Sequence, residues 1–81
     1  MQGLDDLKGQ VLDRLVEVKK ELNRLFRKYE VSSYEELMRE FERIPEEEGF
    51  EDYFLAQNLE YTRRKLEEVL KVLEERVEKV S

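Results

Sequence analysis

Side chains that could carry out chemistry are few in this sequence, and their spacing favours helix caps over catalysis. The 81 residues include no cysteine and no histidine, which excludes thiolate zinc sites, disulfides and histidine-based general-base catalysis. The hydroxyl nucleophile candidates are Ser32, Ser33, Thr62 and Ser81. Ser32 and Ser33 stand three residues before Glu35 and Glu36, which is the spacing of two overlapping helix capping boxes. No base is placed to activate a hydroxyl, so we predict neither enzymatic activity nor a cofactor.

Carboxylates are abundant, and the densest group of them is the natural place to look for a metal site. Glu46, Glu47 and Glu48 are followed closely by Glu51 and Asp52. An EF-hand instead alternates short oxygen ligands along a loop and ends in a bidentate glutamate. A di-metal carboxylate bundle uses Glu-x-x-His pairs, which a chain without histidine does not have. The sequence therefore predicts a solvated acidic run and no metal site.

Charge and aromatic residues are concentrated in the middle of the chain. Residues 30–60 contain eleven acidic and two basic side chains, a net charge of −9, whereas residues 1–29 and 61–81 carry net charges of +2 and +1. All eight aromatic residues lie between positions 26 and 61. Aromatic side chains often anchor interfaces, and an acidic surface attracts a basic partner while it repels nucleic acid. We therefore expect a basic protein partner and no nucleic-acid binding.

The predicted partner-binding residues combine these two properties. They are Tyr34, Phe41, Phe50, Glu51, Asp52, Tyr53 and Phe54. An alternative interpretation is that the aromatic residues fill the core at one end of a helical hairpin, with the glutamates as its solvated rim. The protein would then be a structural homo-oligomeric helical bundle or an adaptor. The two interpretations differ in whether Tyr34, Phe50, Tyr53 and Phe54 stay partly exposed in the free chain.

The pattern of apolar residues predicts three helices. Between Leu4 and Tyr29 apolar residues recur every three or four positions, which is typical of an amphipathic helix over about residues 4–29. The capping serines predict a short helix over about residues 33–44, which Pro45 ends because it disfavours the α conformation at the preceding residue. Pro45 to Gly49 is expected to be a polar connector, and the third helix is expected over about residues 50–80.

Two long amphipathic helices joined by a short one favour an all-α fold in which the long helices run antiparallel, as one domain of residues 1–81. One such hairpin covers only one side of each apolar stripe. We therefore expect a homodimer in which two hairpins form a four-helix bundle, or else burial of these stripes against a different protein. The predicted dimer core consists of Leu7, Val11, Leu15, Val18, Leu22, Leu25, Leu59, Leu66, Leu70, Leu73 and Val77.

The middle of the chain also follows a recognisable order of features. An aromatic-rich turn, a serine cap and an acidic short helix are present in Phe26-Arg27-Lys28-Tyr29-Glu30-Val31-Ser32-Ser33-Tyr34-Glu35-Glu36-Leu37. An acidic connector at Glu46 to Glu48, the segment Asp52-Tyr53-Phe54 and the leucines from Leu66 to Leu73 follow. Over about residues 25–73 this order resembles small archaeal and bacterial antitoxin-like proteins of toxin–antitoxin pairs. Glu30 stands where those proteins tend to have glycine.

This resemblance implies that the protein neutralises a toxin, typically an RNA-cleaving enzyme, by covering it. An RNase attracts phosphates with Lys and Arg, so an acidic, aromatic segment could occupy the same basic surface and exclude RNA. Antitoxins of this kind often bind DNA through a basic or ribbon-helix-helix N-terminal domain. Residues 1–24 show neither, so operator binding is not expected.

Membrane insertion is not expected either. No window of the sequence approaches eighteen consecutive apolar residues, and the N-terminus shows neither a basic run nor an apolar one. The expected location is therefore the cytoplasm.

Overall fold

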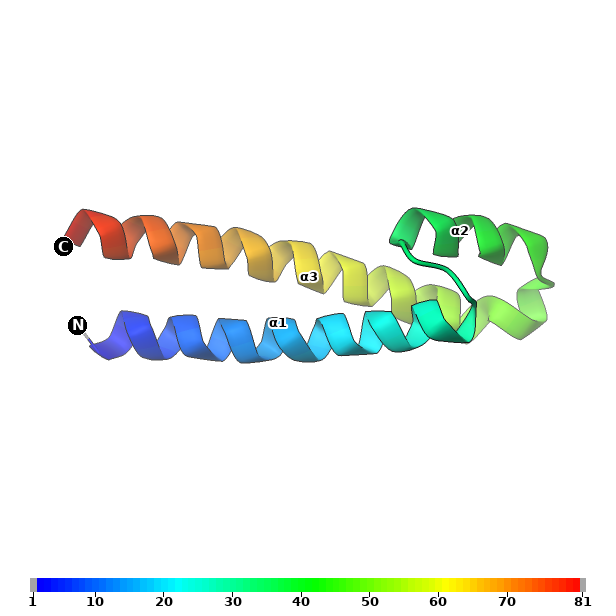
Figure 1. Ribbon diagram of the computed structural model, residues 1–81, viewed down its shortest axis with the longest axis horizontal. Helices are drawn as coiled ribbons and strands as arrows, with labels where there is room; N and C mark the ends of the chain where they lie inside the picture. The colour runs from blue at the N-terminus through cyan, green and yellow to red at the C-terminus, as the bar shows by residue number, and fades with distance from the viewer. Residues whose placement is uncertain (1, 81) are drawn as a thin grey trace.

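Three α-helices build an elongated molecule in the computed structural model, which describes the backbone of residues 2–80 and the side chains of residues 3–76. The helices are α1 (Gln2–Lys28), α2 (Tyr34–Arg43) and α3 (Glu46–Val80). The long helices α1 and α3 run antiparallel, and α2 packs against them at the end farthest from the termini (Figure 1). The molecule measures 52 × 17 × 16 Å. The predicted all-α fold, with two long antiparallel helices and a short helix between them, is confirmed.

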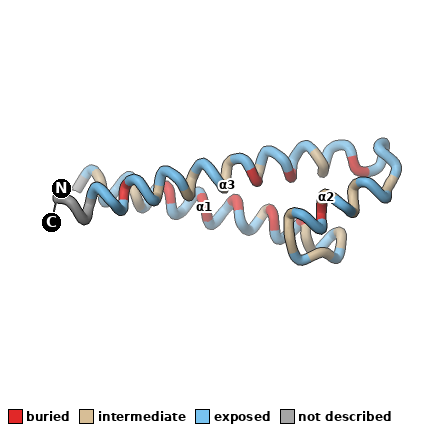
Figure 2. The backbone as a smooth tube through the Cα atoms, turned by 90° about the horizontal axis from the view of Figure 1, so that it is seen from above, coloured by how far each residue is buried: buried red, intermediate tan, exposed pale blue. Residues whose placement is uncertain are grey.

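The apolar stripe of α1 packs against α3 along the hairpin. Figure 2 shows the buried residues on the sides of the helices that face one another. The predicted core residues that are buried within the single chain are Val11, Leu15, Val18, Leu22, Leu25 and Leu73. Leu59, Leu66 and Leu70 are half-buried, and Leu7 is 43% exposed. Val77 lies outside the described side chains. The α1 half of this core is therefore covered by the chain's own α3.

Three ion pairs join the long helices and mark their register. Lys8 lies 3.8 Å from Glu74, Lys19 lies 3.6 Å from Glu67, and Lys28 lies 2.6 Å from Asp52. At least one partner in each pair is well exposed, so each contributes at most about 1 kcal/mol. Removal of the apolar stripe from water is therefore the larger stabilising term, and the ion pairs select one alignment of the helices.

A Schellman motif ends α1 and turns the chain toward α2. The backbone N–H of Val31 donates to the carbonyl of Phe26 over 2.9 Å, and that of Glu30 donates to the carbonyl of Arg27 over 3.3 Å. Glu30 has a φ of 57°, in the left-handed region that favours glycine. The glutamate thus occupies a position where glycine would fit without steric cost.

Ser33 is the N-cap of α2, as the spacing predicts. Its hydroxyl accepts a hydrogen bond from the backbone N–H of Glu36 over 3.2 Å. The carboxylate of Glu36 accepts from the backbone N–H of Ser32 over 2.9 Å and from its hydroxyl over 3.2 Å. These bonds from Ser32 lower the pKa of Glu36. Glu36 therefore serves both serines, in place of the predicted pairing of Ser32 with Glu35.

The predicted polar connector from Pro45 to Gly49 is wrong, and so is the predicted start of the third helix near Phe50. α3 begins at Glu46, because the carbonyl of Pro45 accepts the backbone N–H groups of Glu48 and Gly49 over 3.0 and 3.3 Å. Three glutamates in the first turn suit the positive end of the helix dipole. The acidic run therefore forms a favourable first helical turn in place of the predicted connector.

Gly49 allows α3 to begin immediately after α2. It is buried, and a Cβ atom at this position would lie 2.6 Å from Cδ1 of Ile44 and 3.2 Å from Cδ1 of Phe41. Both distances are shorter than ordinary van der Waals contact. A side chain at position 49 would therefore push the start of α3 away from the end of α2 or displace Ile44.

A small core cluster holds α2 against the hairpin. Leu25 of α1, Leu37 of α2 and Ala56 of α3 are buried, the last two completely. The half-buried residues packed around them are Phe26, Tyr29, Val31, Tyr34, Met38, Phe41 and Leu59. Each of the three helices thus contributes one buried residue to the point where they meet.

Candidate protein-binding site

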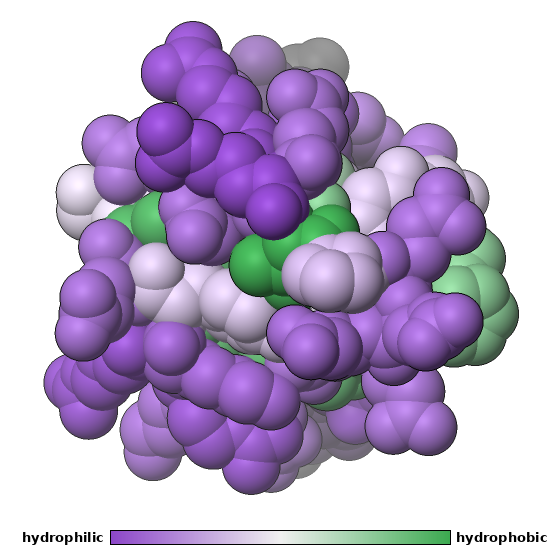
Figure 3. Space-filling model, turned by 90° about the vertical axis from the view of Figure 1, so that its right-hand side faces the viewer, coloured by the Kyte–Doolittle hydropathy of each residue, from purple (hydrophilic) through white to green (hydrophobic). Residues whose placement is uncertain are grey.

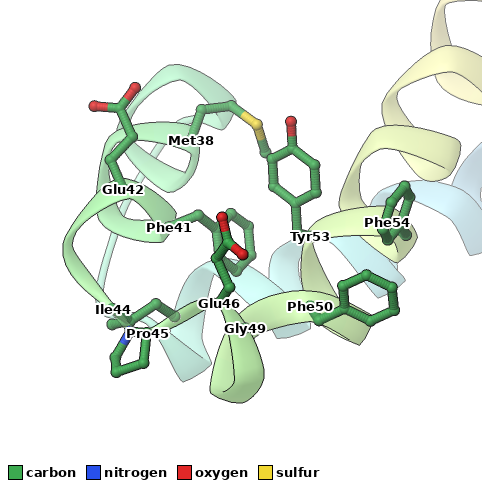
Figure 4. A pocket seen from close by; sticks show the side chains of 10 residues that line it. All are labelled: Met38, Phe41, Glu42, Ile44, Pro45, Glu46, Gly49, Phe50, Tyr53 and Phe54. Carbon is green, nitrogen blue, oxygen red and sulfur yellow. The ribbon is translucent and has the colours of Figure 1, made fainter.

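The α2 end of the molecule contains a pocket of about 530 Å³ between α2 and the first turns of α3 (Figure 4). Its apolar lining comes from Met38, Phe41, Ile44, Pro45, Gly49, Phe50, Tyr53 and Phe54. Glu42 on α2 and Glu46 on α3 also line it. The pocket therefore combines aromatic surface with a carboxylate from each helix.

Aromatic rings connect the interior of the protein to this pocket through edge-to-face contacts. The ring of Phe41 lies 5.0 Å from that of Tyr29 and 5.6 Å from that of Tyr53, measured between centroids. Tyr53 in turn lies 5.6 Å from Phe54, and Phe54 lies 4.9 Å from Phe50. Contacts of this geometry contribute about 0.5–1.5 kcal/mol each beyond the area they bury. The rings nearest the core therefore hold the outer ones in place.

Phe50 and Phe54 lie at the exposed end of this chain of rings. Phe50 is 59% exposed and Phe54 is 48% exposed, and the two side chains lie next to each other on successive turns of α3 (Figure 4). Tyr34 and Tyr53 are half-buried. Single exposed apolar residues are common, but two phenylalanines in contact form a patch that costs free energy in water. Such a patch is suited to burial by another molecule.

Acidic side chains surround the aromatic patch. The exposed carboxylates on this end are those of Glu42, Glu46, Glu47, Glu48 and Glu51. Figure 3 looks onto this end and shows hydrophobic surface near the centre with hydrophilic residues around it, and a second hydrophobic group at the right-hand edge. An apolar centre with a charged rim is the usual layout of a protein-binding surface. Here the charge of the rim favours a cationic partner.

Asp52 is engaged within the chain. Its carboxylate accepts hydrogen bonds from the ammonium group of Lys28 over 2.6 Å and from the hydroxyl of Tyr29 over 2.5 Å. The bond from Lys28, followed by that from Tyr29, lowers the pKa of Asp52. Burial, together with the hydrogen bond to Asp52, raises the pKa of Tyr29 to about 12. Asp52 therefore ties α3 to the end of α1 and stands apart from the exposed acidic rim.

The predicted partner-binding residues separate into two groups. Phe41, Phe50, Tyr53 and Phe54 all line the pocket. Tyr34 lies instead beside Glu60, and both its burial and that carboxylate raise the pKa of Tyr34. Glu51 is exposed on the first turns of α3 and does not line the pocket.

Sequence reasoning missed the pocket residues that are not aromatic. Met38, Ile44 and Pro45 had been assigned only to the helix and its end, and Gly49 only to the connector. The position of Gly49 could have indicated the pocket. This glycine follows three glutamates and stands four residues before Tyr53, and a residue without a side chain permits two helices to approach closely. That signal becomes informative only once residues 46–50 are known to be helical.

Glu60 was also missed as a buried charge. It is 6% exposed, and its carboxylate accepts from Nε of Arg63 over 2.5 Å and from Arg64 over 3.5 Å. The hydrogen bond from Arg63 is the main cause that lowers the pKa of Glu60. Glu67 accepts a second bond from Arg63 over 2.8 Å. This network has its charges paired within α3, as buried ionised groups require.

The described residues bring together no group of three or more acidic side chains that could hold a metal ion. Within residues 2–80, none of the helices combines the length and the apolar composition that crossing a membrane requires. The described pocket offers apolar and carboxylate side chains as its lining.

Comparison with known proteins places the chain in one family. No curated protein and no solved structure matches it. A family model described as "Uncharacterized protein MJ0235 family" matches residues 4–78, which include all of α2, both long helices over most of their length and every residue of the pocket. The chain belongs to the MJ0235 family.

Proposed function

We propose that the protein is a non-enzymatic interaction module whose acidic, aromatic pocket binds a basic protein partner. The observation that carries the proposal is the contact between Phe50 and Phe54, which stay 59% and 48% exposed and line the same pocket as two glutamates. Complete burial of a phenylalanine yields about 1.5–3 kcal/mol, so burial of the remaining exposed area of both rings would provide a useful part of a binding energy.

Electrostatics supports a basic partner. Residues 30–60 carry a net charge of −9 and include the whole of α2 and the first turns of α3, where the pocket lies. Charge of this kind raises the rate of encounter with a cationic surface and fixes its orientation, while the apolar centre supplies affinity. Glu42 and Glu46 would meet lysine or arginine side chains beside the apolar anchor of the partner.

A toxin of the RNase type is the partner that we propose on the resemblance to antitoxin-like proteins. Such an enzyme needs a basic surface to hold RNA, and an acidic cover over that surface would exclude the substrate by steric and electrostatic occlusion. In this proposal the two proteins meet in the cytoplasm. The Asp-Tyr-Phe segment that carries part of this resemblance contributes two rings, Tyr53 and Phe54, to the pocket lining.

The experiment that tests this function uses the product of the neighbouring open reading frame, provided that it is basic and of the size of a nuclease. Titration calorimetry would compare the unmodified chain with Phe50→Ala/Phe54→Ala. Loss of two partly exposed rings should weaken binding by about 10- to 100-fold. Tyr61→Ala, which removes an exposed ring outside the pocket, should leave binding unchanged.

Two outcomes would count against the proposal. Equal losses in Phe50→Ala/Phe54→Ala and in Tyr61→Ala would show that the partner does not recognise the pocket specifically. Unchanged binding in Phe50→Ala/Phe54→Ala, with the same helix content by circular dichroism, would remove the pocket from the interaction.

We also propose that the hairpin self-associates into a four-helix bundle. The observation that favours this arrangement is a set of exposed apolar residues along α1 and α3, outside the pocket. These are Leu7, Leu12, Val16, Leu55, Val69 and Val72, each at least 36% exposed. Sedimentation equilibrium of the full chain tests this association, and a single species with the mass of one chain at about 100 μM, well above a micromolar dissociation constant, would disprove it.

A further inference from the structure

A row of residues at seven-residue intervals runs along α3 beside the seam with α1. Its members are Glu48, Leu55, Thr62, Val69 and Arg76. Seven residues are nearly two turns of an α-helix, so these side chains lie on one side of α3. The direction of successive members changes by only about 20°. Glu48, Leu55, Val69 and Arg76 are exposed, and Thr62 is half-buried. We refer to these five residues as the α3 row.

The α3 row borders the apolar residues that α1 covers only in part. Leu59 and Leu66, which face α1, are still half-buried instead of buried. A groove of about 420 Å³ runs between the two helices here and is lined by Leu55 and Leu59 on one side and by Arg14 and Glu21 on the other. A further helix laid along the α3 row would therefore complete the burial of Leu59 and Leu66 as well as covering Leu55 and Val69.

The area of the molecule shows that a partner of substantial size can be accommodated. A compact monomer of 9.9 kDa is expected to expose about 5,200 Å². The chain exposes 6467 Å². This excess is larger than the roughly 800 Å² per partner that a standard interface buries. A side-by-side pair of these rods would bring the exposed area per chain close to that of a compact protein.

The order of charges along the α3 row identifies the occupant and its direction. Thr62 is the midpoint, with Leu55 and Val69 at equal distances on either side and Glu48 and Arg76 at equal distances beyond them. In an antiparallel pair centred on Thr62, Leu55 of one copy meets Val69 of the other, and Glu48 meets Arg76. A parallel pair would place Glu48 against Glu48 and Arg76 against Arg76, which is unfavourable.

The overall charge distribution favours the same direction. Residues 30–60, which form the α2 end, carry −9, whereas the rest of the chain carries +3. Antiparallel packing keeps the acidic ends of the two copies apart, whereas parallel packing would set them side by side. We propose that a second copy of this chain packs antiparallel along the α3 row, on a two-fold axis that passes close to Thr62. This inference rests on the proposed self-association and is independent of the proposed toxin-like partner.

Single-cysteine variants of the full chain test the inference, because the natural sequence has no cysteine. Thr62→Cys should form disulfide-linked dimers under mild oxidation. An equal mixture of Leu55→Cys and Val69→Cys chains, tagged to differ in size, should form the mixed dimer. Each of these two variants alone should form about tenfold less, because two copies of the same residue would be much farther apart than a disulfide spans. Lys71→Cys, exposed elsewhere on α3, is the control that should not cross-link.

The outcomes separate this inference from self-association itself. If sedimentation shows a dimer but Leu55→Cys alone cross-links efficiently, the antiparallel direction is wrong. If Lys71→Cys cross-links in place of Thr62→Cys, the two copies pack through a different face of α3. In both cases self-association would stand. A monomer at all concentrations would end both proposals.

A charge reversal tests the pairing of Glu48 with Arg76. Glu48→Arg and Arg76→Glu should each weaken the dimer by about three- to tenfold, and the variant that combines them should restore its affinity. Failure of that restoration would contradict the inferred register.

Discussion

The hydroxyl of Tyr29 donates a hydrogen bond of 2.5 Å to the carboxylate of Asp52, which joins the turn after α1 to the first turns of α3. The same carboxylate accepts from Lys28 over 2.6 Å. Asp52 thus closes the hairpin at the end where α2 must pack. Because Tyr29 also contacts Phe41 through its ring, this contact links the hairpin to the pocket.

Removal of this hydroxyl should weaken the hairpin. Tyr29→Phe keeps the ring contact with Phe41 but loses one hydrogen bond to a charged acceptor, so the free energy of unfolding should fall by about 1–2 kcal/mol. Urea denaturation followed by circular dichroism measures the change. Tyr61→Phe is the matched control, since Tyr61 is 65% exposed and its loss should change stability by less than about 0.5 kcal/mol. Equal effects of the two substitutions would show that the Tyr29 bond contributes nothing specific.

Stability should decline at both extremes of pH through this same pair of residues. The pKa of Asp52 is lowered by folding from its ordinary 3.8, so its contribution is present above about pH 4 and is lost as the pH falls through the folded value. The pKa of Tyr29 is raised from 10.0 to about 12, so its contribution is complete below pH 10 and is lost between pH 10 and about 12. Denaturant midpoints across pH measure both declines. In Tyr29→Phe the decline between pH 10 and 12 should be smaller, and an unaltered alkaline profile would refute this assignment.

Glu30, whose backbone is in the left-handed region, offers a stabilising substitution. Glu30 has a φ of 57°, which costs a residue with a Cβ atom about 1–2 kcal/mol. Glu30→Gly should relieve this strain and raise the free energy of unfolding by about 0.5–1 kcal/mol, after the larger entropy of glycine in the unfolded chain is counted. Glu30→Ala keeps the Cβ atom and separates strain from charge. If alanine stabilises as much as glycine, the gain comes from the removal of charge.

Two helical glycines should respond in opposite ways to a side chain. A Cβ atom at Gly9 would meet nothing within 4 Å, so Gly9→Ala should raise stability by about 1 kcal/mol through helix propensity. At Gly49 a Cβ atom would lie 2.6 Å from Ile44, so the branched side chain of Gly49→Val should lower stability by about 1–3 kcal/mol. Thermal denaturation of the two variants compares them directly. A stabilised Gly49→Val would mean that α2 and α3 are not held as closely as described.

Much of the fold could be predicted from the periodicity of apolar residues, because one face of each helix must be buried. The stripe from Val11 to Leu25 is continuous and identifies α1 without ambiguity. The start of α3 could not be placed in this way, because residues 46–49 contain no apolar side chain with which to extend the pattern. Their helical state depends on hydrogen bonds to the carbonyl of Pro45 and on the helix dipole. Both effects are local, so they produce no periodic pattern in the sequence.

The candidate site was predictable in composition and only partly in geometry. Aromatic content located Phe41, Phe50, Tyr53 and Phe54, all of which line the pocket. Sequence could not show that Asp52 is engaged by Lys28, because residues 24 positions apart meet only when the hairpin register is fixed. The burial of Glu60 was hidden for a similar reason. Tyr34 of α2 lies beside Glu60, although the two residues are far apart in the sequence.

The first turn of α1 and the last turn of α3 lie together at the end of the rod opposite the pocket (Figure 1). Within one chain, a fluorescent label fused at either extremity would therefore lie almost the full 52 Å length of the molecule away from the pocket. Either fusion should leave the pocket of that same chain equally accessible.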